Sequence, residues 1–250
     1  MMIKYETKDG IGILSLNRPE KRNALHPELV KQMKTKLKEV EKDRSIKVLI
    51  ITGEGKAFCA GADLEYLNQL KDYSTLENEK DSRELAELFL MIYNFPIPVI
   101  AAVNGAAIAG GCGLASVCDS IVADEVNAKF GYSEVKIGFI PALVSTFIIR
   151  KIGEGMAKQL LMSGEIINGK RAYEIGFVNY IYSNALTGSL DVASKMKGNS
   201  SQSMKLTKNM IRKVSGLSVV DAVEYCIGLN TISRTTEDFK EGLNNFLTKK

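Results

Sequence analysis

Two segments of the sequence place runs of glycine and alanine where a buried strand would pass into a helix. They are GEGKAFCAGADLEYL at residues 53–67 and NGAAIAGGCGLASVCD at residues 104–119. Side chains this small do little chemistry themselves, but they expose backbone N–H groups and let a ligand approach the chain closely. Two such loops could each contribute one N–H group, and a pair of such donors can stabilise an oxyanion. The alternative is structural, because small residues also let two elements pack closely.

A nucleotide-binding loop is a third interpretation of residues 104–119, and the details of the segment argue against it. The chain has no GK[ST] sequence of a P-loop, and no GxGxxG follows its first strand. Gly110 instead begins a predicted helix. The positive N-terminal end of a helix favours an anion or a polarised carbonyl.

The elements that must position these loops alternate between strand and helix. Residues 3–19 predict a β-hairpin with Asp9-Gly10 as its turn. Beyond it the predicted strands lie near residues 46–53, 97–105, 120–124 and 128–134, and the predicted helices near 26–43, 75–94, 142–163 and 169–175. The pattern is helical only from about residue 186. This order predicts an α/β fold, with a core at residues 1–185 and a helical region at residues 186–250.

Composition restricts the class of protein. The chain has 250 residues, of which 45% are hydrophobic and 25% charged, as in an ordinary globular protein. We expect no membrane span and no signal peptide, because no apolar run is long enough. Four cysteines without a CxxC motif and a single histidine predict no metal site, no disulfide framework and a cytoplasmic location. The net charge of +4 suits a phosphorylated small molecule.

Four motifs, in their order along the chain, resemble those of one protein family. They are LNRPEKRNAL, AFCAGADL, AVNGAAIAGGCGLASVCD and TTEDFKEGLNNFL. Together they are similar to the enoyl-CoA hydratase/isomerase (crotonase) superfamily. The resemblance implies a spiral of ββα turns and C-terminal helices that build a homotrimer or homohexamer. It also implies an acyl-CoA thioester as substrate, with its enolate oxygen bound by the N–H groups of Ala62 and Gly110.

The resemblance places one catalytic carboxylate on Glu134, in FGYSEVKIG, and leaves a second one missing. Hydratases of the family usually carry another glutamate at the position of Gly113. A single carboxylate can move a proton between two carbons, which is Δ3,Δ2-enoyl-CoA isomerase chemistry. The segment GFIPALVSTFIIRKIGEG nevertheless resembles a bacterial hydratase branch that includes methylglutaconyl-CoA hydratase-like proteins. We therefore expect an enoyl-CoA hydratase, with the isomerase as the alternative and decarboxylation as a third reaction.

The resemblance also implies contacts with coenzyme A, which is part of the substrate; no separate cofactor is expected. The candidate contacts are the backbone of Ala60 and the side chains of Lys21, Arg22, Lys56, Phe246 and Lys249, of which Phe246 and Lys249 would reach the CoA of a neighbouring subunit.

Several other residues of reactive type are expected to be structural. His26 and Asp63 each precede a predicted helix, Asp119 lies between a helix and a strand, and Cys112 has no histidine partner. One family member binds RNA, and the segment 31–42 is rich in lysine. Interspersed glutamates and the lack of aromatic residues there argue against nucleic-acid binding.

Overall fold

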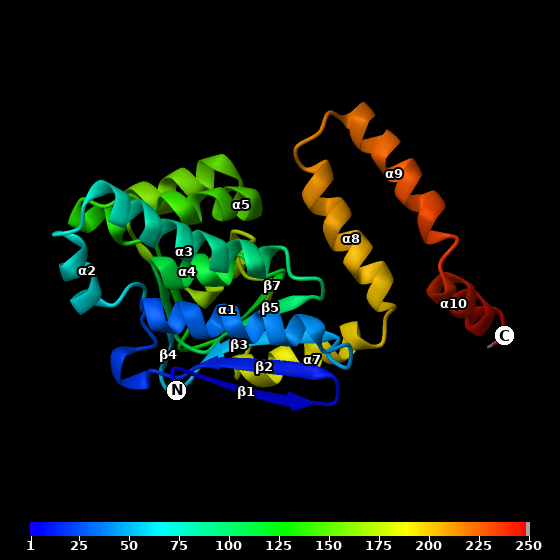
Figure 1. The fold of residues 1–250 in the computed structure, drawn as a ribbon, viewed down its shortest axis with the longest axis horizontal. Helices are drawn as coiled ribbons and strands as arrows, with labels where there is room; N and C mark the ends of the chain where they lie inside the picture. The colour runs from blue at the N-terminus through cyan, green and yellow to red at the C-terminus, as the bar shows by residue number, and fades with distance from the viewer. Residues whose placement is uncertain (249–250) are drawn as a thin grey trace.

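Two β-sheets lie at the centre of the protein, which we describe from a computed structural model over residues 1–248 (Figure 1). The strands are β1 (Ile3–Lys8), β2 (Ile11–Leu16), β3 (Val48–Gly53), β4 (Ala57–Cys59), β5 (Val99–Val103), β6 (Ala106–Ile108), β7 (Ser120–Asp124), β8 (Lys129–Gly131), β9 (Ile166–Asn168) and β10 (Tyr180–Tyr182). The α-helices are α1 (Pro27–Lys42), α2 (Leu64–Leu70), α3 (Thr75–Tyr93), α4 (Gly110–Ser116), α5 (Ala142–Ser163), α6 (Gly169–Glu174), α7 (Ala185–Lys197), α8 (Ser201–Val214), α9 (Val219–Ser233) and α10 (Glu237–Thr248). Two short 3-10 helices are η1 (Pro19–Lys21) and η2 (Glu134–Ile137).

The larger sheet has the strand order β1-β2-β3-β5-β7-β10, and the smaller sheet has the order β4-β6-β8-β9. In the larger sheet, β1 and β2 form the predicted antiparallel hairpin, and the remaining pairs are parallel. Asp9 and Gly10 both have positive φ angles, 49° and 77°, as a type I′ hairpin turn requires. The predicted turn is therefore confirmed.

Both faces of the larger sheet are covered, and its central strands β2, β3, β5 and β7, which are mostly apolar, are buried at every position. Leu49 and Ile51 of β3 belong to the main core beneath α1, α3, α4 and α5. Val48 and Ile50 point to the opposite face, where they pack with residues of α7. A sheet covered on both faces has continuous hydrophobic strands rather than alternating ones, which matches the predicted buried strand at residues 46–53.

The chain repeats a unit of two strands followed by helix. Strands β3, β5 and β7 lie next to one another in the larger sheet, and the strands that follow them, β4, β6 and β8, lie next to one another in the smaller sheet. The first unit is completed by α2 and α3, the second by α4 and the third by α5. The spiral of ββα turns implied by the resemblance is confirmed.

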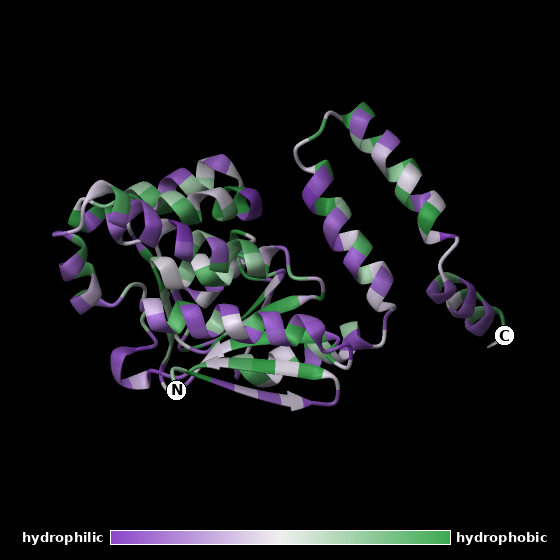
Figure 2. Cartoon of the chain, in the orientation of Figure 1, coloured by the Kyte–Doolittle hydropathy of each residue, from purple (hydrophilic) through white to green (hydrophobic). Residues whose placement is uncertain are grey.

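Helices α8, α9 and α10 form an extended arm, residues 201–248. The arm stands away from the rest of the protein, residues 1–200, which we call the body (Figure 1). The arm contains no buried residue, and Figure 2 shows hydrophobic bands along it. Helix α8 is attached to the body where Lys208 Nζ lies 2.6 Å from Asp119 Oδ2 and Arg212 donates to the carbonyl of Tyr93. The predicted boundary near residue 185 falls at the start of α7. That helix packs on the sheet, so the arm begins one helix later.

Within residues 1–248, no helix combines the length and the apolar character that crossing a bilayer would need.

Candidate active site

The two glycine/alanine loops lie side by side. A Cβ atom on Gly61 would stand only 3.1 Å from the carbonyl oxygen of Ile108. Leu25 touches both loops, since it forms an isolated β-bridge with Ala62 and its Cδ1 lies 3.0 Å from the Cβ position of Gly110. The parallel pairing of β4 with β6 explains this arrangement. Each loop follows the carboxyl end of its strand, and the carboxyl ends of neighbouring parallel strands lie at the same edge of the smaller sheet.

The N–H groups of Ala62 and Gly110 donate no hydrogen bond to any residue within 1–248. Both residues are partly exposed. The next residue after Ala62 behaves differently, because the N–H of Asp63 donates to the carbonyl of Leu25 over 2.9 Å. The two backbone donors proposed from the sequence thus keep their hydrogen-bonding capacity for a ligand.

The start of α4 shows why this segment needs very small residues. Ala109 precedes the helix with φ 51° and ψ −122°, a conformation that side chains disfavour. A Cβ atom on Gly111 would lie 2.0 Å from the carbonyl oxygen of Cys59, far inside van der Waals contact. Glycine is therefore required at 111 for α4 to approach β4, and this close approach brings the Gly110 loop to the Ala62 loop.

Glu134 reaches the same edge of the smaller sheet. Strand β8 pairs with β6, with Gly131 opposite Ile108, and η2 begins at Glu134 three residues later. The side chain is only 8% exposed, and its Oε2 has no hydrogen-bond partner within residues 1–248. Burial raises the pKa of this carboxyl above its ordinary value of 4.5. A buried carboxylate with an open oxygen and a raised pKa is suited to accept and return protons.

Cys112 and Tyr132 are buried close enough to Glu134 to interact with its charge. Burial raises the pKa of the Cys112 thiol to about 12, so the thiol is protonated at neutral pH. The expectation that Cys112 is not a nucleophile is consistent with this state. Neither neighbour carries a positive charge, which leaves desolvation as the dominant influence on Glu134.

Position 113 is filled by a neighbouring side chain and offers no free volume. A Cβ atom on Gly113 would lie 2.2 Å from Cγ1 of Val144 and 3.3 Å from a ring carbon of Phe89. A larger side chain introduced at this position would therefore require Val144 to move. Val144, which is 4% exposed, takes the place of the missing side chain.

The predicted coenzyme A contacts at the N-terminal side of the site gather around one loop. Lys21 is exposed and its Nζ lies 2.5 Å from Oε1 of Glu65. The N–H of Ala60 donates to the carbonyl of Arg22 over 3.0 Å, which leaves only the Ala60 carbonyl for a ligand. Lys56 is exposed in the turn between β3 and β4.

The two predicted contacts at the C-terminus do not join this group within one chain. Phe246 is 68% exposed on α10, at the end of the arm (Figure 1). Lys249 lies outside the described residues. Contact of Phe246 with a coenzyme A would therefore require another copy of the chain, as the resemblance implies.

The residues expected to be structural make structural contacts. His26 and Asp63 accept hydrogen bonds from the backbone at the starts of α1 and α2, and Asp119 accepts one from the N–H of Val99. No group of three His, Cys, Asp or Glu side chains within residues 1–248 is arranged to hold a metal ion.

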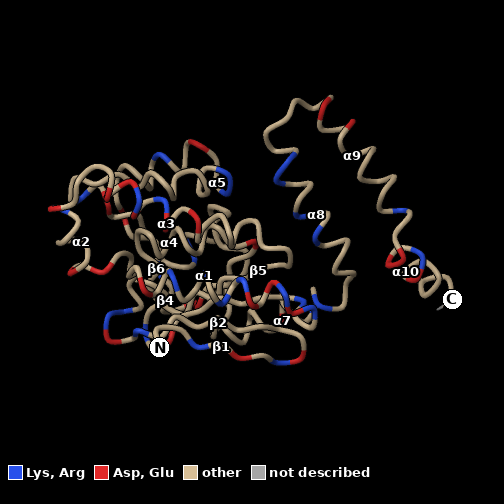
Figure 3. Tube along the Cα trace, viewed as in Figure 1, with Lys and Arg blue, Asp and Glu red and all other residues tan. Residues whose placement is uncertain are grey.

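The lysines of α1 lie among acidic residues, as the sequence suggested. Lys34 Nζ lies 2.8 Å from Glu84 and 2.5 Å from Glu87, both on α3, and Lys36 pairs with Glu39. Figure 3 shows the resulting mixture of positive and negative residues along α1 and α3. This surface lacks the continuous positive charge of a nucleic-acid site.

Sequence reasoning missed three residues that shape the site: Arg18, Asn23 and Val144. The first two are part of the motif LNRPEKRNAL, which was recognised without a role for either side chain. Asn23 binds the segment before Ala62, and Arg18 pairs with Asp63, the residue directly after it. Nothing in the sequence around Val144 indicated its contact with position 113, because 31 residues separate the two.

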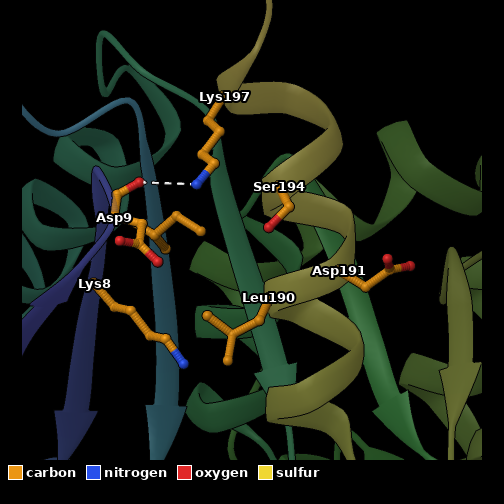
Figure 4. Close-up of a pocket in the computed structure, with 7 residues that line it drawn as sticks. Lys8, Asp9, Leu190, Asp191, Ser194 and Lys197 are labelled. Atoms are coloured by element: carbon orange, nitrogen blue, oxygen red, sulfur yellow. Dashed lines mark hydrogen bonds between the residues drawn. The ribbon is translucent and has the colours of Figure 1, made fainter.

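A surface pocket of about 210 Å³ lies elsewhere, between the β1–β2 turn and α7 (Figure 4). Lys197 Nζ donates to the carbonyl of Asp9 across this pocket, over 3.1 Å. Lys8, Asp191 and Ser194 also line it. None of the residues proposed for the active site contributes to this pocket.

Comparison with known proteins agrees with the fold and with the motifs. The family model described as enoyl-CoA hydratase/isomerase matches residues 6–250. The chain belongs to this family. Its relatives include the 2,3-dehydroadipyl-CoA hydratase of Escherichia coli, which is 36% identical over 95% of this chain and 92% of its own length.

Other members of the enoyl-CoA hydratase/isomerase family are similar over equally long stretches. The crotonyl-CoA hydratase of Syntrophomonas wolfei is 34% identical over 99% of this chain and 95% of its own length. The crystal structure of an enoyl-CoA hydratase from Polaromonas sp. JS666 is 31% identical, with a TM-score of 0.94 over 99% of this chain and 97% of the other. The family and its fold are thus established over the whole described chain.

Proposed function

We propose that this protein is an enoyl-CoA hydratase, which adds water across the double bond of a 2-enoyl-CoA thioester. The observation on which this proposal rests is a buried carboxylate with an unpartnered oxygen, Glu134, on the same sheet edge as the unpartnered N–H groups of Ala62 and Gly110. Relatives named as hydratases of 2,3-dehydroadipyl-CoA and crotonyl-CoA support the choice of reaction.

In the proposed mechanism, one carboxylate handles both proton transfers. The Glu134 carboxylate accepts a proton from water while the water oxygen bonds to C3 of the enoyl group. The electron pair of the double bond moves toward the thioester, and the N–H groups of Ala62 and Gly110 donate to the resulting enolate oxygen. The protonated Glu134 then gives its proton to C2, so that one water has been added and the carboxylate is restored.

Coenzyme A recognition is proposed at the loop around β4. The carbonyl of Ala60 is the acceptor for the adenine amino group, and Lys56, Lys21 and Arg22 supply positive charge for the phosphates. Support comes from the exposure of these three side chains and from the backbone hydrogen bonds that join the segment of Arg22 to Ala60 and Gly61, beside Ala62. Phe246 and Lys249 are proposed to reach the coenzyme A bound to a neighbouring subunit.

We also propose that the protein is a homotrimer or a pair of stacked homotrimers. The arm, residues 201–248, exposes large apolar side chains along all three of its helices, including Val223, Ile227 and Phe246. Val223 and Ile227 line an apolar groove of about 410 Å³ between α8 and α9. An exposed apolar surface of this kind is typical of an interface between subunits.

The isomerase remains the second candidate because position 113 carries no carboxylate and Val144 fills the space next to it. An assay of the purified protein with crotonyl-CoA, a 3-enoyl-CoA and methylglutaconyl-CoA separates the two reactions. We expect hydration of a 2-enoyl thioester and no conversion of the 3-enoyl substrate. Conversion of the 3-enoyl substrate by a protein that leaves both 2-enoyl substrates unchanged would contradict the hydratase and support the isomerase.

A further inference from the structure

The segment of residues 18–25 holds the loop that leads to Ala62 at several points. The side-chain amide of Asn23 donates to the carbonyls of Glu54, at 2.9 Å, and Ala57, at 2.8 Å. Further along, the N–H of Leu25 donates to the carbonyl of Gly61 over 2.7 Å. The chain between β3 and α2, which includes β4, is therefore bound along its length by a segment distant in sequence.

Arg18 completes this contact with a buried ion pair. Its guanidinium donates to the carbonyl of Ala24 over 2.8 Å and to Oδ2 of Asp63 over 2.8 Å. Arg18 is 9% exposed and Asp63 is 4% exposed. Each of the two terminal nitrogens of the guanidinium makes one of these hydrogen bonds. Together the two bonds fix the guanidinium plane relative to the segment of Ala24 and to the segment of Asp63.

Asp63 is the residue directly after Ala62, and its backbone N–H and both of its carboxylate oxygens are hydrogen-bonded. The other carboxylate oxygen of Asp63 accepts from the N–H groups of Glu65 and Tyr66 at the start of α2. The Asp63 N–H donates to the carbonyl of Leu25. The Arg18 guanidinium holds the pKa of the Asp63 carboxyl below its usual value, so the carboxylate stays ionised at neutral pH.

We infer that Arg18 is a positioning residue for the reaction: through Asp63 and Ala24 it holds the Ala62 N–H in the direction needed to bind the enolate oxygen. This inference rests on the proposed function of Ala62. Arg18 itself touches no reacting atom. Arg18 acts through the peptide that it fixes. A small misplacement of the Ala62 N–H weakens the hydrogen bond to the developing charge on the enolate oxygen more than the contact with the neutral substrate.

A purely structural role would have a different consequence. Buried ion pairs often contribute little net stability, and breaking one destabilises the fold as a whole. A protein weakened in that way would lose folded molecules without changing how a folded molecule polarises its bound thioester. A measurement of how strongly the folded protein polarises the carbonyl of its bound thioester therefore distinguishes a positioning role of Arg18 from a purely structural one.

The test uses two conservative variants and one matched control. Arg18→Lys keeps the positive charge but cannot reproduce the forked contact with Ala24 and Asp63. Asp63→Asn keeps an acceptor oxygen for the N–H groups at the start of α2 and weakens the ion pair by removing the charge of Asp63. This variant replaces Arg18→Lys if Arg18→Lys does not fold. Asp119→Asn is the control, because it weakens another partly buried pair, with Lys208, away from the loop of Ala62.

Each folded variant is saturated with butyryl-CoA labelled with carbon-13 at the thioester carbonyl, and the infrared carbonyl band is compared with that of the free thioester. We expect the wild type and Asp119→Asn to lower the carbonyl frequency equally, and Arg18→Lys and Asp63→Asn to lower it less. With 2-enoyl-CoA, kcat should fall about 10- to 100-fold in the two loop variants while KM changes far less.

A full wild-type frequency shift and an unchanged kcat in folded Arg18→Lys and Asp63→Asn would overturn the positioning role of Arg18. Failure of the proposed function gives a different result. In that case the wild type itself would bind butyryl-CoA without lowering its carbonyl frequency, or would not bind it.

Discussion

At the scale of single residues, the site depends on groups that lack partners. The partly exposed Ala62 and Gly110 N–H groups and the buried Glu134 Oε2 atom have no hydrogen-bond partner within residues 1–248, and leaving a buried polar atom unpaired is costly. Gly113 shows the opposite situation, because its missing side chain is replaced by Val144. The site thus combines open hydrogen-bonding groups with a closely packed apolar wall, and each feature gives a testable expectation.

Glu134→Gln should reduce turnover about 10²- to 10⁴-fold, because it removes the group that accepts and returns the proton. The change is nearly isosteric, so acyl-CoA binding should stay close to that of the wild type. Steady-state hydration and calorimetric binding of butyryl-CoA measure the two effects. Glu125→Gln, at an exposed glutamate between β7 and β8, is the control and should leave both unchanged. Retention of more than about a tenth of wild-type turnover would remove Glu134 from the mechanism.

The pH dependence of hydration should report the raised pKa of Glu134. The ionised carboxylate is the form that accepts a proton from water, so activity should fall as the pH drops through this pKa. Because burial raises the pKa above 4.5, half of the activity should be lost at a pH above 4.5. The measurement is kcat/KM against pH at constant ionic strength, with stability followed in parallel. A folded enzyme with its acid midpoint at or below 4.5 would be inconsistent with this assignment.

Gly113→Glu should destabilise the protein, because its Cβ atom would overlap Val144 Cγ1. Overpacking a core typically costs about 1–3 kcal/mol in the free energy of unfolding. Val144→Gly alone should also destabilise, by leaving a cavity, whereas the double variant should recover part of the loss. Denaturant unfolding of the four proteins measures this coupling. Simple additivity of the two single changes would show that positions 113 and 144 do not share one volume.

At the scale of elements, the site depends on how closely α4 approaches β4. The helix has only seven residues, from Gly110 to Ser116, and much of its sequence is small. Its first turn packs on the backbone of Cys59, and its preceding residue, Ala109, donates to the carbonyl of Gly131 over 2.7 Å. The helix is therefore fixed between β4 and β8. A side chain added on its inner face would move the Gly110 donor.

Gly111→Ala should impair both stability and turnover, since the added methyl group would meet the Cys59 carbonyl at 2.0 Å. We expect a loss of at least about 2 kcal/mol in the free energy of unfolding and a large fall in kcat. Gly155→Ala, on the exposed side of α5 with no atom within 4 Å, is the matched control. The control should leave the free energy of unfolding and kcat close to those of the wild type, because the added methyl group meets no atom. Equal stability of Gly111→Ala and the wild type would contradict the close packing.

At the scale of the whole molecule, the body and the arm differ in kind. The body buries both faces of its larger sheet, whereas the arm has no buried residue and carries Val219, Val220 and Ile232 at the surface. Lysine and arginine gather on α8, and most of α9 is uncharged (Figure 3). In the proposed trimer, contact with the other copies of the chain would remove this apolar surface from water.

A charge placed in the groove of the arm should prevent assembly. The double variant Val223→Asp, Ile227→Asp changes two residues that line the groove between α8 and α9. Light scattering coupled to size exclusion should give the mass of three or six chains for the wild type and of one chain for the variant. Glu125→Lys, on the body, should leave the mass unchanged. A wild type that elutes as a single chain at micromolar concentration would contradict the proposed trimer.

Local sequence determined the longer elements of this protein and the types of its site residues, whereas the short strands β9 and β10 were not predicted. The Asp9-Gly10 turn, the buried strand of residues 48–53 and the helix that begins at Gly110 all follow from short-range patterns, because turn geometry and hydrophobic periodicity are local properties. Tertiary structure alone decided which residues meet. The three ββα units have no common sequence period, and the contact between Gly113 and Val144 joins positions on different helices. The pairing of Arg18 with Asp63 likewise forms only when the chain packs, since volumes and ion pairs are shared by residues far apart in sequence.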